Sequence, residues 1–67
     1  MTGRPIERLL EEALAAVPAE RRTHVAERIK AGEDYRLAIR QLQFGASDRV
    51  VLGLLKRAVK DLEDLRP

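Results

Sequence analysis

Basic side chains recur at helical spacing in the last third of the chain. Arg49, Gly53, Lys56 and Lys60 follow one another at intervals of four, three and four residues. In a helix this spacing places them on one ridge, with Arg57 directly beside it. Three cations would then share a face with a glycine whose missing side chain leaves the backbone open to close approach. Such a ridge is suited to an anionic partner.

The distribution of charge supports this interpretation more than the total does. The net charge is only +2, but residues 34–60 carry six basic and two acidic side chains, whereas residues 1–33 carry six of each. A local excess of positive charge favours a polyanion such as nucleic acid. The alternative is an ordinary solvated helix face.

Other reactive chemistry is scarce in this sequence. There is no cysteine, so disulfides and thiolate metal sites are excluded. His24 is the only histidine and lies on the polar side of its predicted helix, and a histidine metal site needs partners that this chain lacks. The glycines are isolated and form no phosphate-binding loop. We therefore expect no enzyme, no cofactor and no metal site.

Apolar residues define the helix that carries the basic ridge. Val51, Leu55, Ala58, Leu62 and Leu65 step by four and three residues, which predicts a helix from residue 48 to residue 65 with its apolar side opposite the cations. Just before it stands a serine, a residue type whose hydroxyl can cap the first turn of a helix.

Three further helices precede this one. Pro5 suits the first position of a helix that ends at Val17, because the residue before a proline avoids helical geometry. Pro18 opens the second helix, in which Arg22 falls on the thin apolar face and must either extend to solvent or pair with a carboxylate. Gly32 either ends this helix or is tolerated inside a continuous one. The third helix covers residues 34–44.

These patterns predict an all-α protein, a small bundle of about four helices in a single domain spanning residues 1–67. Gly45 is expected to adopt the left-handed conformation in the turn before the last helix. No period-two stretch predicts a strand, and no apolar run approaches the 18–20 or so residues of a membrane span. We therefore expect a cytoplasmic protein that does not enter the membrane.

Apolar surface beyond the needs of one small bundle predicts self-association. Leu37 and Phe44, seven residues apart, form a second apolar ridge on the third helix. A helix that is apolar on two sides is usually packed between two partners. We expect a homodimer, or binding to another protein, through a set of apolar residues on the last two helices: Leu37, Phe44, Leu54, Leu62 and Leu65.

The last two helices and their short glycine turn have the layout of a helix-turn-helix. From residue 18 to residue 62 the chain resembles region four of bacterial sigma factors, their DNA-binding end. In those families a proline-led helix and a glycine precede a scaffold helix, and Gly-x-Ser precedes a recognition helix. The positions that carry the resemblance here are Pro18, Gly32, Gly45, Ser47, Val51, Leu55, Arg57, Ala58 and Leu62.

The resemblance implies that the first turns of the last helix enter the major groove of duplex DNA. Arg49 would then contact a guanine edge or a phosphate, Gly53 would admit the sugar-phosphate backbone, and Lys56, Arg57 and Lys60 would contact phosphates. The predicted function is thus a DNA-binding, dimeric transcriptional regulator. The alternative is a helical interaction or oligomerisation module, such as an antitoxin, an adaptor or a regulator of a larger complex, that binds no nucleic acid.

Overall fold

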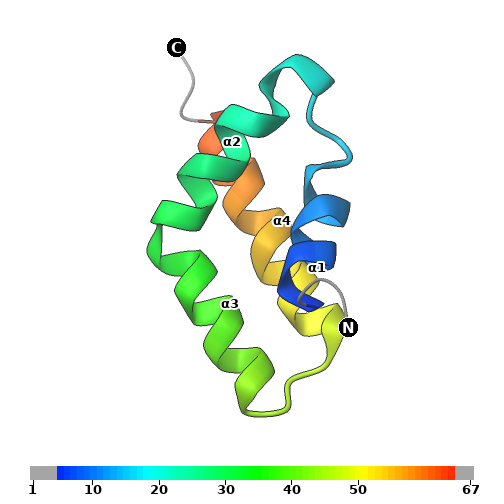
Figure 1. The fold of residues 1–67 in the computed structure, drawn as a ribbon, viewed down its shortest axis with the longest axis vertical. Helices are drawn as coiled ribbons and strands as arrows, with labels where there is room; N and C mark the ends of the chain where they lie inside the picture. Colours follow the sequence, from blue (N-terminus) through cyan, green and yellow to red (C-terminus); the bar gives the residue numbers. More distant parts are fainter. Residues whose placement is uncertain (1–4, 65–67) are drawn as a thin grey trace.

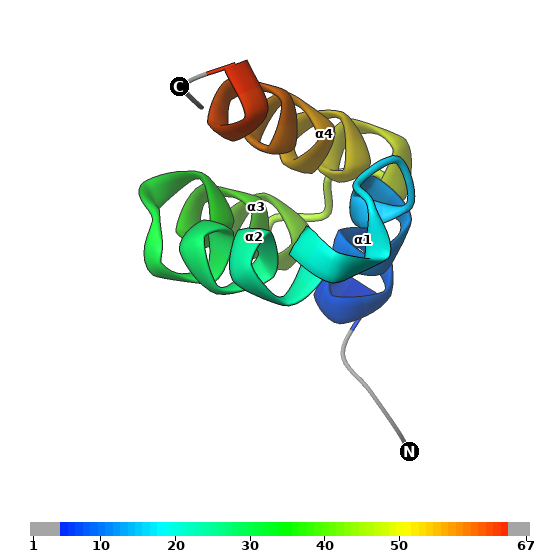
Figure 2. The same cartoon turned by 90° about the horizontal axis from the view of Figure 1, so that it is seen from above.

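One long helix lies across a layer made by three shorter ones. In the computed structural model, which describes residues 5–64, α4 (Asp48–Asp64) crosses one face of α1 (Pro5–Leu14), α2 (Ala19–Ala31) and α3 (Glu33–Gln43) (Figures 1 and 2). Helices α2 and α3 follow one another along the longest dimension of the molecule, 36 Å. Each helix contacts the other three. The predicted all-α bundle of four helices is confirmed.

The core is built from the apolar stripes that the sequence predicts. Helix α1 buries its whole stripe, and α4 buries its own stripe against α1 and α3. Tyr35, Ile39 and Leu42 of α3 are partly buried around Ala38, which has no exposed surface. The predicted core position Leu65 lies outside the described residues. The buried apolar side chains are Ile6, Leu9, Leu10, Ala13, Leu14, Val17, Val25, Ile29, Ala38, Val51, Leu55, Ala58 and Val59.

The first helix ends at Leu14, three residues before the predicted end at Val17. Arg22 contacts the segment between the observed and the predicted end. Its Nε donates to the carbonyl oxygens of Leu14, at 3.1 Å, and of Val17, at 2.8 Å, while a terminal nitrogen donates to Ala15, also at 3.1 Å. The Leu14 carbonyl also accepts from the Val17 N–H at 2.9 Å, so the guanidinium mainly satisfies the Ala15 and Val17 carbonyls, which the helix end leaves open. Arg22 is exposed and binds this helix terminus rather than pairing with a carboxylate.

Gly32 separates α2 from α3, so the predicted break is confirmed and the continuous helix is wrong. Its backbone is extended, with φ −93° and ψ 171°, and its N–H donates to the Ile29 carbonyl at 3.0 Å. This single non-helical residue lets α3 begin immediately at Glu33.

The turn between α3 and α4 matches its sequence signals. Gly45 has φ +89°, the left-handed conformation that only glycine adopts without strain. Ser47 caps α4, since its Oγ accepts from the Val50 N–H at 3.3 Å. None of the helices described within residues 5–64 has the length and apolar character needed to cross a membrane.

Candidate nucleic-acid interface

The five predicted contact residues lie on one exposed side of α4. Arg49, Gly53, Lys56, Arg57 and Lys60 are all solvent-exposed, and we call them the basic face. The opposite side of the same helix carries the fully buried Val51 and Leu55. Core packing therefore fixes the rotation of α4 about its axis and directs the basic face away from the protein.

Four carboxylates lie near these cations, and one of them pairs with the basic face. Glu12 and Glu63 line the same hollow as Lys56 and Lys60, and Asp61 follows Arg57 by four residues. Asp64 pairs with Lys60 at 3.3 Å, an exposed i,i+4 contact. Asp48 precedes Gly53 by five residues, which places it about 140° around the helix from the centre of the basic face. Within residues 5–64, Arg49, Lys56 and Arg57 form no ion pair, so three of the four cations of the basic face are not directly paired there.

Gly53 lies at the centre of the basic face and faces open space. A Cβ atom added there would meet no heavy atom within 4 Å. Close packing of a second helix of this chain is therefore not the reason for a glycine at this position. Its absent side chain leaves a flat strip of helix backbone between cations.

An ion pair between helices steadies the end of α4. Arg21 of α2 donates to Glu63 Oε1 at 2.6 Å, and the two side chains are 35% and 26% exposed. Partial burial reduces solvent screening, so this contact is stronger than an exposed pair. It joins the start of α2 to the last turn of α4. No local pattern predicts this pairing, because the two residues are 42 positions apart.

The residues of the predicted oligomer interface differ in exposure in the structure. Leu37 and Phe44 are exposed, at 41% and 79%, whereas Leu54 and Leu62 are half-buried and pack against the core. Leu65 lies outside the described residues. Val50 is a further exposed apolar side chain, at 54%. The apolar spacing of the sequence did not predict it. Its exposure follows from the rotation of α4, because it lies four residues before Leu54 on the edge of the buried stripe.

Hollows on the surface are shallow and lie between helices. One of about 400 Å³ separates the α2–α3 junction from the C-terminal half of α4, and one of about 470 Å³ lies between α1 and Lys56 and Lys60 of α4. Within the described part of the chain, no three acidic, histidine or cysteine side chains are grouped to hold a metal ion.

Comparison with known proteins gives no further assignment. No protein-family model, curated protein or solved structure matches this chain.

Proposed function

We propose that this protein binds duplex DNA through the basic face of α4 and acts as a dimer. One observation carries the proposal. Exposed cations surround a glycine that faces open space, on a helix whose other side is buried in the core. A rigid helix with a free cationic side presents its charges in a fixed array. Such an array suits the regular spacing of phosphates.

The dimensions of the basic face fit a short length of duplex. From Arg49 to Lys60 the helix rises about 16 Å, at 1.5 Å per residue. Phosphates along one strand advance about 3.4 Å each along the DNA axis, so this distance corresponds to roughly five base pairs. Lys56, Arg57 and Lys60 would contact phosphates, while Arg49 in the first turn would reach a guanine edge or a phosphate.

The connection between α3 and α4 supports a helix-turn-helix role for this pair. The two helices are joined by four residues that include Gly45 in the left-handed conformation, and α4 begins at a serine cap. The resemblance to region four of sigma factors makes α4 the recognition helix. Its N-terminal turns would enter the major groove and α3 would support them from behind.

A protein-interaction module is the second candidate function. Leu37, Phe44 and Val50 are the exposed large apolar side chains of the described residues, and all three lie on α3, α4 or the turn between them. Grouped apolar surface of this kind marks a contact with protein rather than with nucleic acid.

Salt-dependent binding to duplex DNA tests the first candidate. With four phosphate contacts, the logarithm of the binding constant should fall with the logarithm of salt concentration with a slope of about −3.6. The double variant Arg49→Ala, Lys56→Ala removes two contacts, so its slope should fall to about −1.8 and its affinity should drop. Fluorescence anisotropy of a labelled duplex at several salt concentrations measures both quantities.

A charge-matched variant separates the basic face from general electrostatic attraction. Arg8→Ala, Lys30→Ala removes two exposed cations from α1 and α2 and should leave the slope unchanged. Equal slopes for both double variants, or no binding by the parent at low salt, would reject the DNA-binding role and favour the interaction module.

A further inference from the structure

A strip of surface follows the line along which α3 and α4 meet. On α3, Asp34, Leu37 and Gln41 share one edge, because they are spaced by three and four residues. On α4 a second edge is spaced by four, three and four residues and consists of Val50, Leu54, Arg57 and Asp61. Asp34 and Asp61 line the same hollow, so these two edges adjoin. We call this strip, together with Phe44 at its far end, the seam.

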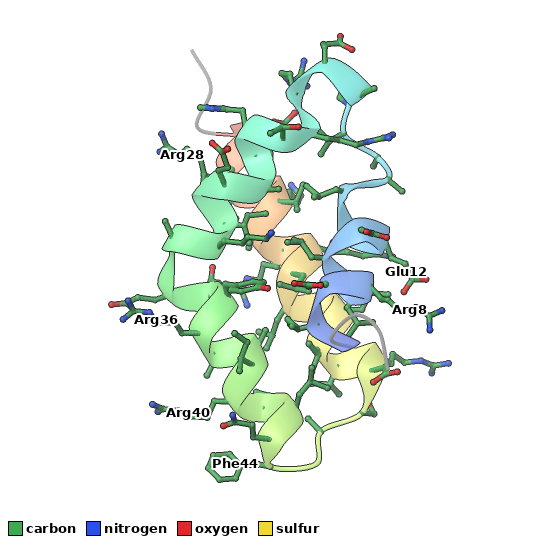
Figure 3. The ribbon with its side chains drawn as sticks, in the orientation of Figure 1. Arg8, Glu12, Arg28, Arg36, Arg40 and Phe44 are labelled. Carbon is green, nitrogen blue, oxygen red and sulfur yellow. The ribbon has the colours of Figure 1, made fainter. Side chains whose placement is uncertain are left out.

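The two ends of the seam differ in charge. The residues that line the hollow include three carboxylates, Glu33, Asp34 and Asp61, and one cation, Arg28. Arg57, one turn before Asp61 on the same edge of α4, reduces this excess of negative charge without cancelling it. Toward the α3–α4 turn lies Arg40 of α3, which projects from the same side of the molecule as Arg28 and Arg36 (Figure 3). The hollow end is therefore the more acidic end of the seam.

The two ends also differ in shape. Phe44 is 79% exposed and stands out from the C-terminal end of α3 (Figure 3). At the opposite end lies the hollow of about 400 Å³, with Ile29, Gly32 and Leu62 among its lining residues. An enclosed cavity of about 150 Å³ accommodates benzene, so the volume of this open hollow is large enough for a phenyl ring. Arg28 at the rim can contact the face of such a ring.

We infer that the seam binds a second copy of this chain in antiparallel orientation, with Phe44 of each copy seated in the hollow of the other. This inference deepens the proposed dimer and rests on it, but it does not depend on DNA binding. An interface related by a two-fold axis must be complementary to itself. A surface with a protrusion and positive charge at one end, and a hollow and negative charge at the other, meets this condition only when the copies run in opposite directions.

Charge favours the antiparallel arrangement. Two seams in parallel would place Asp34 and Asp61 of one copy against the same carboxylates of the other. The antiparallel arrangement instead brings Arg40 toward the acidic end of the second copy. The apolar centre, Leu37 and Leu54, then lies near the two-fold axis. Lys56 and Lys60, on the α1 side of α4, stay clear of the seam, whereas Arg57 belongs to both the seam and the basic face.

Removal of the aromatic ring tests the interface. Phe44→Ala should raise the dimer dissociation constant about tenfold or more, because an aromatic side chain seated in a pocket is a dominant contact. Gln43→Ala, at the neighbouring exposed position, should leave it unchanged. Sedimentation equilibrium without DNA gives the constants, and circular dichroism checks that both variants keep their helices. A parent that stays monomeric at high concentration, or a Phe44→Ala dimer as tight as the parent, overturns the inference.

Introduced cysteines report the direction in which the two copies pack. The chain contains no cysteine of its own, so each variant carries a single thiol. Val50→Cys and Asp61→Cys lie on one edge of α4 about 16 Å apart, so each should meet the other, rather than itself, across an antiparallel dimer. Mixed chains should form a 50–61 disulfide on mild oxidation, and either variant alone should form little. Lys56→Cys mixed with Asp61→Cys is the control that should not cross-link.

The outcomes also separate this inference from DNA binding. A dimer that forms no mixed 50–61 disulfide overturns the inference. A monomer that binds DNA overturns it while sparing the proposed basic face. A dimer that forms the mixed disulfide but does not bind DNA supports the inference and rejects only the DNA-binding role.

Discussion

Arg22 shows how one side chain supports the end of a helix. Its guanidinium donates to three backbone carbonyls at the end of α1 and in the loop that follows. The Leu14 carbonyl also accepts from the Val17 N–H, but those of Ala15 and Val17 would otherwise depend on water, and Val17 is buried. The contact therefore ties the α1–α2 connection to the core.

Arg22→Ala should lower the free energy of unfolding by about 1–2 kcal/mol. Hydrogen bonds from a charged donor are each of this order, and the exposure of Arg22 reduces their sum. Urea denaturation followed by circular dichroism measures the change. Thr23→Ala, at the next exposed position, should shift the free energy by less than about 0.5 kcal/mol. Equal effects for the two variants would show that the cap contributes nothing.

Two glycines should respond oppositely to the same substitution. Gly45→Ala forces a Cβ into left-handed geometry and should destabilise the protein by about 1–2 kcal/mol. Gly53→Ala lies inside an exposed helix with open space around it and should stabilise by about 1 kcal/mol. Thermal melts of both variants test this. Destabilisation by Gly53→Ala would mean that its surface is covered.

Among the elements, α3 packs on the core through a small residue. Ala38 is completely buried on the core side of α3, and α4 presents the fully buried Val51 and Leu55 to the same core. An alanine allows helix backbones to approach more closely than a larger residue does. A larger side chain at this position would therefore push α3 away from the core.

Ala38→Leu should destabilise the protein by about 1–3 kcal/mol, because the added atoms have no space without moving α3. Leu37→Ala, at the adjacent but exposed position, should change the stability of the monomer by much less. Denaturant unfolding at low protein concentration isolates the monomer. If both variants lose the same stability, the packing of α3 on the core is looser than the burial of Ala38 indicates.

For the whole molecule, the small size of the chain limits its stability. A domain of this length obtains only about 3–5 kcal/mol of net stability from its core. Association of two copies adds stability by mass action, since the partner binds only the folded chain. Dimerisation through the seam would thus support folding as well as present two basic faces.

The melting temperature should therefore rise with protein concentration. A hundredfold increase in protein concentration should raise the melting temperature of the parent. The rise should be much smaller for Phe44→Ala, because that variant weakens the dimer. Differential scanning calorimetry over this range gives the comparison. A parent melting temperature that is independent of concentration would show that folding and association are not coupled.

The chain pattern alone was sufficient for the helices, the Gly45 turn, the Ser47 cap and most of the core, since each depends on neighbours within a few residues. Spacing at three and four positions places Val51 and Leu55 on one side of a helix whatever surrounds it.

Contacts between distant segments could not be predicted in this way. The ion pair of Arg21 with Glu63, the cap by Arg22 and the exposure of Val50 follow from how helices rotate and pack against one another. The same holds for the hollow opposite Phe44, which exists only where the α2–α3 junction meets α4. Periodicity specifies which side of a helix is apolar, whereas the neighbours of each remaining side chain are specified by the folded packing.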